Sequence, residues 1–185
     1  MIAPGEIVVI TGIMAAGKST VAQALAERLP LSVHLRGDLF RRMIVNGQAD
    51  MTPGNWEVAE RQLRLRQRLA CQAAVTYAAE GFAVVYQDII LGHDLSLVVN
   101  LLDPARQPVS VVVLAPSPEV AAHRDRERSK TGYDAWTAID LDAGLRRDTP
   151  RLGLWLDTSG MTVDESVAAI LRRHGEARVP PGEVS

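Results

Sequence analysis

The sequence has few of the residues that build several common kinds of binding site. Only 4% of its 185 residues are aromatic, and Cys71 is the single cysteine. A lone cysteine excludes an intramolecular disulfide and a metal site built from several cysteines. So few aromatic residues disfavour a nucleic-acid partner held by base stacking, and a formal net charge of −2 predicts no broad basic surface for one.

Long apolar runs are missing too. No stretch approaches the roughly 20 apolar residues of a membrane-spanning helix, and the N-terminus does not follow the order of a secretory signal. We therefore expect a cytoplasmic protein with no membrane partner. The length and the hydrophobic content of 47% fit one α/β domain over residues 1–185.

Short apolar runs alternate with helical patterns along the chain. The alternation predicts a three-layer α/β fold, in which helices cover both faces of a five-stranded parallel sheet. The expected strands are Glu6–Ile10, Ser32–Leu35, Phe82–Tyr86, Val109–Leu114 and Leu154–Leu156. The expected helices are 21–29, 38–45, 56–79, 95–102 with Asp94 as N-cap, one from Ser117 into 124–130, 135–145 and 162–174. The tail, residues 175–185, is expected to be flexible.

The strongest motif follows the first strand. Gly12–Ser19 matches G-x-x-x-x-G-K-[ST] at every fixed position. In such a loop, backbone N–H groups converge on phosphate oxygens, the lysine reaches the β- and γ-phosphates, and the hydroxyl binds Mg²⁺. The sequence therefore predicts a P-loop fold with ATP and Mg²⁺ as cofactors. The residues expected at the phosphates are Gly12, Ala15, Ala16, Gly17, Lys18, Ser19 and Thr20.

Lysine is otherwise nearly absent. Among 20 basic residues, all but Lys18 and Lys130 are arginine. A GC-rich genome explains such a bias without any functional reason. Lys18, however, stands where a compact charge on a flexible stem is needed and the planar fork of arginine fits poorly. Its position therefore strengthens the assignment of the phosphate loop.

Two aspartates follow the second and third strands, where a parallel sheet places its ligands. Asp38 can accept the proton of an attacking hydroxyl, and Arg41 one turn later can hold the transferring phosphoryl group. Alternatively, Asp38 caps the following helix, while Arg41 and Arg42 are solvated. Asp88 can bind Mg²⁺ through water or position Arg41, or else it caps a turn.

Arginines of residues 124–134 form a candidate lid. Arg124 and Arg128 are four residues apart, so they share one face of a helix. On a segment that closes over ATP, they would neutralise charge that develops on the γ-phosphoryl oxygens. A solvated face of alternating charge is the alternative, because acidic residues are interleaved with them.

Taken together, these segments resemble the small P-loop kinases related to chloramphenicol phosphotransferase, zeta toxin and the kinase half of phage polynucleotide kinase. The resemblance spans about residues 5–174. It implies that Asp38 activates the acceptor hydroxyl and that Arg124 and Arg128 are the lid arginines. Arg41 matches the arginine three positions after the acidic residue in the polynucleotide kinase pattern.

The resemblance extends to two further segments. Asp88–Gly92 is similar to the Asp-Val-Phe-Leu-Gly stretch of the chloramphenicol enzymes. Asp157–Gly160 resembles the loop that flanks the adenine in these kinases, which implies that Thr158 and Ser159 lie at the cofactor. The chain has no hydrophobic strand that ends in Asp-Glu, which argues against a mechanical ATPase.

We expect the acceptor between the segment after Asp38 and the long helix that begins at Trp56. The predicted acceptor residues are Asp38, Arg41, Trp56 and Asp88. Met43, Met51 and His93 could line the same pocket or simply pack. Arg61, Arg64 and Arg68 share a helix face that could bind an anionic acceptor or be solvated.

The leading hypothesis is an ATP-dependent phosphotransferase that acts on a hydroxyl of a small molecule. An antibiotic, a nucleoside or a related metabolite suits the resemblance, and antibiotic resistance is a candidate role. The alternatives are a 5′-hydroxyl polynucleotide kinase, a nucleotide-dependent switch or binding module, and a toxin that acts on a nucleotide sugar. The sequence leaves the oligomeric state open.

Overall fold

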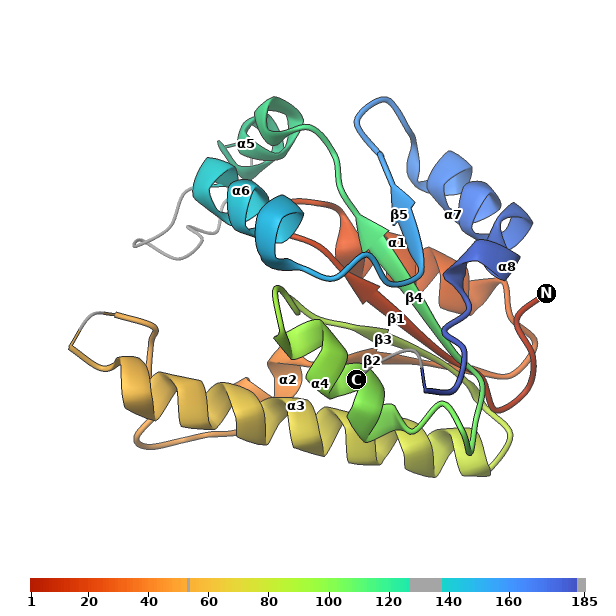
Figure 1. Ribbon diagram of the computed structural model, residues 1–185, viewed down its shortest axis with the longest axis horizontal. Coiled ribbons are helices and arrows are strands. Elements are labelled where there is room, and N and C mark those ends of the chain that lie inside the picture. The colour runs from red at the N-terminus through yellow and green to blue at the C-terminus, as the bar shows by residue number, and fades with distance from the viewer. Residues whose placement is uncertain (53, 127–137, 183–185) are drawn as a thin grey trace.

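The computed structural model describes residues 1–52, 54–126 and 138–182 (Figure 1). Its centre is a five-stranded sheet, parallel throughout, in the order β2-β3-β1-β4-β5. The predicted α/β fold is confirmed, and each strand lies within one residue of its expected ends. The strands are β1 (Ile7–Thr11), β2 (Ser32–Arg36), β3 (Ala83–Gln87), β4 (Val109–Leu114) and β5 (Leu154–Leu156).

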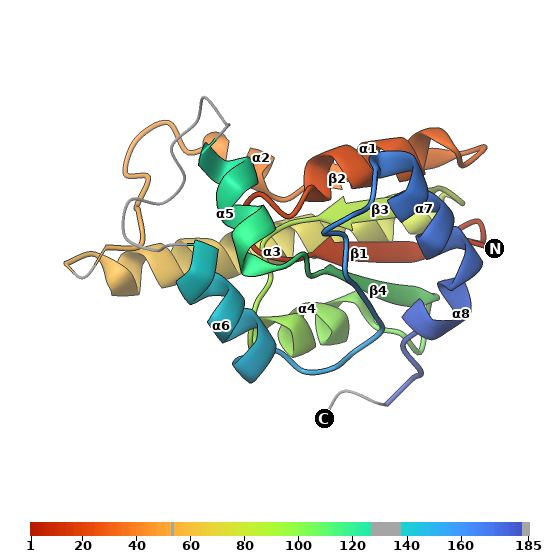
Figure 2. The ribbon, with the colours of Figure 1, turned by 90° about the horizontal axis from the view of Figure 1, so that it is seen from above.

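Helices cover both faces of this sheet (Figures 1 and 2). On one face, α1 packs against α7, and on the other α3 packs against α4. Among the described residues, no helix is both long and apolar enough to cross a membrane. The helices are α1 (Lys18–Glu27), α2 (Asp38–Arg42), α3 (Trp56–Ala79), α4 (Asp94–Leu102), α5 (Pro118–Arg126), α6 (Ala138–Asp148), α7 (Val163–Arg172) and α8 (His174–Ala177).

The central strands form the core because they are apolar on both faces. Every residue of β1, β3 and β4 is buried, as expected for a parallel sheet covered by helices on both sides. The long helix α3 turns three small residues toward this core, at a spacing of four. These are Ala70, Ala74 and Ala78, and their small size lets the helix approach closely.

Two expectations about the ends of elements were wrong. His93, not Asp94, is the N-cap of α4, and Asp94 is its first helical residue. The Asp94 carboxylate accepts a hydrogen bond from Gln67 Nε2 on α3, at 3.0 Å, so a tertiary contact has replaced the cap. The short helix α2 ends at Arg42 rather than near Val45.

The first part of the supposedly flexible tail is packed against the sheet, which corrects the prediction for residues 175–179. Helix α8 ends at Ala177, and Arg178 forms an antiparallel bridge with Ser110 of β4. The N–H of Val179 donates to the carbonyl of Val109, at 3.0 Å, and its side chain is buried. Burial of apolar groups and backbone pairing outweigh the entropy of a free end here.

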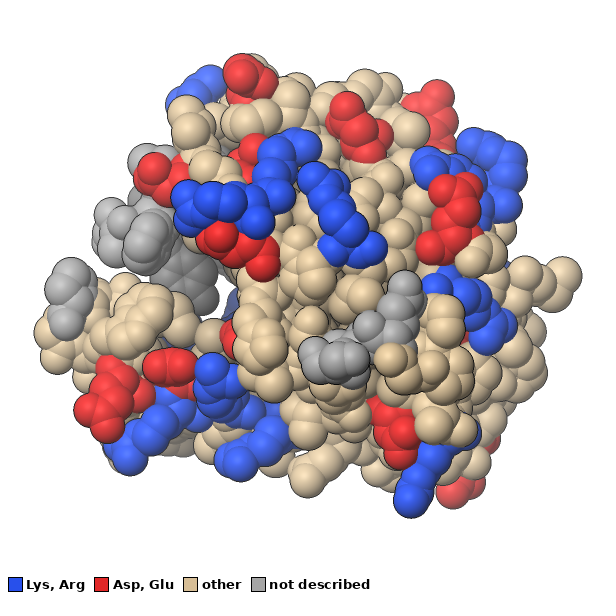
Figure 3. All heavy atoms as spheres, viewed as in Figure 1, with Lys and Arg blue, Asp and Glu red and all other residues tan. Residues whose placement is uncertain are grey.

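Charged side chains of both signs are interspersed over the face shown in Figure 3. Acidic and basic groups lie side by side there, as the net charge of −2 predicts. That face therefore presents no broad basic surface of the kind that binds a nucleic-acid backbone.

Candidate active site

The phosphate loop connects β1 to α1 at the carboxyl edge of the sheet. Positive φ angles of 144° at Gly12, 57° at Ala15 and 89° at Gly17 give it its shape. A side chain at Gly12 would place its Cβ 2.4 Å from the carbonyl oxygen of Leu114, so only glycine fits there. No side chain caps α1, and its first turn holds no acidic residue, so its N-terminal N–H groups face no competing anion from that turn.

Lys18 and Ser19 both lie at the start of α1. Lys18 is buried, and its Nζ donates to the carbonyl of Ile13 within the loop, at 2.7 Å. Ser19 Oγ donates to Oε1 of Gln87 at the end of β3, at 3.1 Å. Gln87 is buried and is a site residue that the sequence did not indicate, because its contact with Ser19 spans 68 positions.

Asp38 is the first residue of α2, and one of its oxygens is held by two arginines. Its Oδ2 accepts from Arg36 Nη2 at 3.3 Å and forms an ion pair with Arg42 Nη2 at 2.7 Å. Its Oδ1 is buried and has no hydrogen-bond partner among the described residues. Asp38 does not act as a cap for α2, whose N-cap is Gly37 with no side-chain cap bond. One carboxylate oxygen is thus fixed, and the other is left as an acceptor.

The alternative in which Asp88 positions Arg41 does not occur. Arg41 instead forms an ion pair with Asp50, and its carbonyl accepts from Gln48. The arginine that pairs with Asp38 from within α2 is Arg42, four residues later. Neighbouring helical residues point about 100° apart, so only one of the two arginines can lie over Asp38.

Asp88 is buried behind the end of β3 and pairs with Arg66 of α3. Arg66 Nη2 donates to Asp88 Oδ1 at 3.1 Å, and the N–H of Ile89 donates to the same oxygen at 2.8 Å. Burial raises the pKa of Asp88, and the charge of Arg66 is the largest opposing influence. Direct coordination of Mg²⁺ by Asp88 would have to displace this arginine, whereas the expected role, binding of Mg²⁺ through water, stays a prediction.

The charges of Lys18 and Asp38 both act on Asp88. Lys18 lowers the pKa of Asp88 and Asp38 raises it, both by weaker effects than burial. Gly37 packs directly on Asp88, since a Cβ on Gly37 would lie 2.1 Å from Asp88 Oδ2. The phosphate loop, Asp38 and Asp88 therefore form one electrostatically coupled group.

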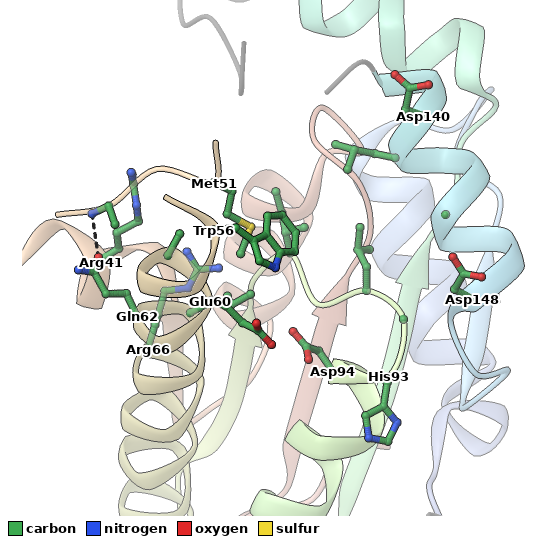
Figure 4. Close-up of a pocket in the computed structure, with 18 of the residues that line it drawn as sticks. Arg41, Met51, Trp56, Glu60, Gln62, Arg66, His93, Asp94, Asp140 and Asp148 are labelled. Carbon is green, nitrogen blue, oxygen red and sulfur yellow. Dashed lines mark hydrogen bonds between the residues drawn. The ribbon is translucent and has the colours of Figure 1, made fainter. Parts of the chain in front are cut away.

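A cavity of about 600 Å³ opens beside this group (Figure 4). Of the predicted acceptor residues, Arg41 and Trp56 line it, whereas Asp38 and Asp88 do not. Asp88 is connected to the wall of the cavity by its ion pair with Arg66. The remaining lining comes from the segment between α2 and α3, from α3, from the segment between β3 and α4 with the first residue of α4, and from α6. It includes Met51, Glu60, Leu63, Leu91, His93, Asp94, Leu141, Arg147 and Asp148.

Of the other residues considered for the pocket, some line the cavity and some do not. Met51 and His93 line the cavity as considered, but Met43 is 69% exposed and does not. The arginine face of α3 turns away from it: Arg64 and Arg68 line a separate hollow against α4. The arginine of α3 that does face the site is Arg66, which lies off that face. In the sequence, Arg66 differs from the other arginines of this helix in one way: it lies two residues from both Arg64 and Arg68, and therefore off the face that they share.

A second group of predicted residues meets at the other side of the phosphate loop. Arg124 on α5 donates to the carbonyl of Thr158 at 3.0 Å. Ser159 Oγ accepts from the N–H of Ser117, at 2.7 Å, and its own N–H donates to Asp157. The structure thus brings Arg124, Thr158 and Ser159 together, while Arg128 and Lys130 lie outside the described residues.

These features define a class of protein. A glycine-containing phosphate loop between β1 and α1, on a parallel sheet of order 2-3-1-4-5, is the P-loop nucleotide-binding fold. The chain belongs to the AAA domain family, which matches residues 7–150.

Several known proteins are similar to this chain in sequence or in structure. A UPF0200 protein of Aeropyrum pernix is 28% identical over 142 residues, which are 76% of this chain and 75% of that one. The structure of Mycobacterium tuberculosis APS kinase CysC with AMPPNP and APS has a TM-score of 0.68 at 20% identity, covering 93% of this chain and 98% of that chain. The tunicamycin resistance protein of Deinococcus radiodurans has a TM-score of 0.65 at 20% identity, covering 95% and 99%.

Proposed function

We propose that the protein is an ATP-dependent phosphotransferase that moves the γ-phosphoryl group of ATP to a hydroxyl of a small molecule. The proposal rests mainly on how the site is arranged. The phosphate loop with Lys18, and the carboxylates Asp38 and Asp88 that interact electrostatically with each other, lie beside a cavity of about 600 Å³. That volume suits a small organic acceptor rather than a polymer.

Each part of the site has a role in this reaction. Backbone N–H groups of Gly12–Thr20 and Lys18 bind the phosphates, and Arg124 with Thr158 and Ser159 binds on the nucleoside side. Ser19 Oγ and the nucleotide phosphates would hold Mg²⁺, which neutralises charge on the phosphate oxygens when bound. Ser19 Oγ donates its hydrogen to Gln87 Oε1, so its lone pairs would remain available to such a metal ion.

Asp38 is the proposed general base. The acceptor oxygen attacks the γ-phosphorus, its proton passes to Asp38 Oδ1, and the bond to the β–γ bridging oxygen breaks so that ADP leaves. Arg42 and Arg36 hold the other carboxylate oxygen and so orient the base. Arg128, as a lid arginine, remains a prediction from the resemblance.

The similar proteins favour this class of reaction. One of them is named for APS kinase activity and was solved with an ATP analogue, and another is named for resistance to an antibiotic. An antibiotic, a nucleoside or a related metabolite is therefore the acceptor class to test first, with self-protection as a candidate role.

The test is phosphoryl transfer from labelled ATP to a panel of hydroxylated antibiotics, nucleosides and sugars, together with a 5′-hydroxyl oligonucleotide. We expect transfer to a small molecule. Steady hydrolysis of ATP without any transfer would overturn the proposal, and transfer to the oligonucleotide alone would replace its acceptor class.

The role of Asp38 is tested separately with Asp38→Asn. Loss of the base should lower kcat by about 10²- to 10⁴-fold, while the Kd for ATP changes little because the phosphate loop is intact. Asp103→Asn removes an exposed carboxylate beyond α4 and serves as the matched control. An unchanged kcat in Asp38→Asn would remove this residue from its role.

A further inference from the structure

The cavity beside the phosphate loop has cationic groups that are all neutralised by their own partners. Three arginines line it, and each pairs with a different carboxylate. Arg41 pairs with Asp50, Arg66 with Asp88, and Arg147 with Asp148 in a two-point contact. An anionic acceptor would therefore find no cation here that is not already engaged, and would have to displace a carboxylate to bind one.

Two carboxylates on the opposite wall share a single arginine. Arg64 Nη2 lies 3.0 Å from Glu60 Oε1, and its Nη1 lies 3.8 Å from Asp94 Oδ1. Arg64 itself does not line this cavity. The carboxylates of Glu60 and Asp94 are thus balanced by the single positive charge of Arg64. This leaves a net negative charge on the wall of the cavity.

The positions of these side chains make that negative charge accessible. The carboxylates of Glu60 and Asp94 lie next to each other and point toward each other in Figure 4. Asp94 is fixed by the hydrogen bond from Gln67, so its side chain is held in this direction. The indole of Trp56, 48% exposed, lies beside them on the same wall. An aromatic face next to two carboxylates is the arrangement that binds an organic ammonium group.

The floor of the same cavity holds a fixed ion pair. The side chain of Arg66 is 9% exposed and lines the cavity. Its Nη2 donates to Asp88 Oδ1 at 3.1 Å, and its Nε lies 3.1 Å from Asp88 Oδ2. Arg66 therefore adds no free positive charge that could offset the carboxylates of Glu60 and Asp94.

We infer that the acceptor is a hydroxylated amine, whose ammonium group binds between Glu60 and Asp94 against Trp56. Amino sugars, aminocyclitols and aryl aminodiols are of this chemical class. The inference rests on the proposed phosphotransferase function and adds the charge of its substrate. It also opposes the idea of an anionic acceptor on the arginine face of α3.

The experiment compares matched pairs of acceptors whose amino groups are either free and positively charged or acetylated and neutral. The probes are glucosamine with N-acetylglucosamine, 2-deoxystreptamine with its di-N-acetyl derivative, and 2-amino-1-phenylpropane-1,3-diol with its N-acetyl derivative. Transfer from labelled ATP gives kcat/KM, and calorimetry with a non-hydrolysable ATP analogue gives the binding of each probe. We expect the free amine to be preferred by about tenfold or more in the pair that fits, because a charged hydrogen bond is lost on acetylation.

Variants of Glu60 and Asp94 test whether these two carboxylates cause the preference for the free amine. Glu60→Gln and Asp94→Asn should each raise KM for the amine by about tenfold and leave KM for the N-acetyl partner nearly unchanged. A merely structural role would raise both values equally. Glu80→Gln, which removes an exposed carboxylate just after the far end of α3, should change neither.

The outcomes separate the two proposals. Transfer to the N-acetyl members or to neutral or anionic molecules in preference to amines overturns this inference and leaves the phosphotransferase standing. Equal effects of Glu60→Gln on both members of a pair also overturn it. Absence of transfer to every acceptor, with steady hydrolysis of ATP, overturns the phosphotransferase and the inference with it.

Discussion

Asp88 illustrates how much a single buried residue can organise. Its carboxylate packs on Gly37, accepts from Ile89 N–H and pairs with Arg66. Through these contacts it joins the turn that carries Asp38 to the long helix that forms the cavity wall. A buried carboxylate with one arginine gives a precise position and is costly to desolvate.

The burial of Asp88 has a consequence for stability against pH. Burial raises the pKa of Asp88 above the ordinary 3.8, so the folded protein retains a proton that the unfolded chain releases. Raising the pH through this window therefore costs stability. We expect the unfolding free energy of the wild type to fall relative to that of Asp88→Asn as the pH rises above about 4.

Urea unfolding of both proteins at several pH values measures this difference. The variant is expected to be less stable overall because Arg66 loses its partner, so the informative quantity is the slope against pH. Parallel curves for the two proteins would show that Asp88 does not titrate in this range.

Helix α3 combines structural and functional work in one element. Its small face, with Ala70 and Ala74, packs on the sheet, and its first turns carry Trp56, Glu60 and Arg66 into the cavity. A period of 3.6 residues separates these faces around one axis. Changes of charge on the cavity side need not disturb the packing on the other.

Cys71 lies on the packed side of this helix and reports on it. The thiol is 2% exposed beside Val98 of α4, and burial raises its pKa to about 12. At pH 8 only about one thiol in 10⁴ is ionised. We therefore expect iodoacetamide to label the native protein very slowly and the protein in guanidinium chloride fully, as read by intact mass.

An exposed position on the same helix supplies the control. Thr76→Cys in a Cys71→Ser background places the thiol on the outer face of α3, where native labelling should be fast. Equal rates for Cys71 in native and denatured protein would contradict close packing of α3 on α4.

At the scale of the whole molecule, the residues just before β1 and those around α8 meet at the amino ends of the strands. Glu6, just before β1, is fully buried and accepts from Ser110 at 2.6 Å, and it lies 2.6 Å from His174 Nε2. Arg178 reaches its other oxygen at 3.2 Å. These contacts lie at the amino ends of the strands, on the opposite edge from the phosphate loop.

This cluster should contribute to the stability of the fold and should not affect the catalytic activity. His174→Ala removes one partner of a buried carboxylate, which should lower the unfolding free energy by about 1–3 kcal/mol. Kinetic constants below the unfolding temperature should not change. Glu176→Ala, which breaks an exposed ion pair with Arg173, should cost less than about 1 kcal/mol.

Chemical denaturation of the two variants compares these values directly. A loss of stability in His174→Ala no larger than that in Glu176→Ala would show that the buried cluster carries no special weight.

Local pattern was sufficient for the elements and for the nucleotide loop. Helix α3 and strands β4 and β5 occur at their expected bounds because hydrophobic periodicity depends on nearby residues. The phosphate loop was equally readable, since Gly12, Gly17 and Lys18 act within one turn of chain. The site beyond it was readable only in part: Arg41 and Trp56 reach the cavity, but Arg41 has Asp50 as its partner.

The sequence by itself therefore determined the P-loop fold and the position of the phosphate loop, because both follow from residues close together in the chain. Only the tertiary structure decided which polar groups meet. Arg66 with Asp88, Gln87 with Ser19, and the shared arginine of Glu60 and Asp94 each join different elements. Spacing along one helix or strand cannot specify such pairs, since they depend on how the elements pack and on which buried charges must be neutralised.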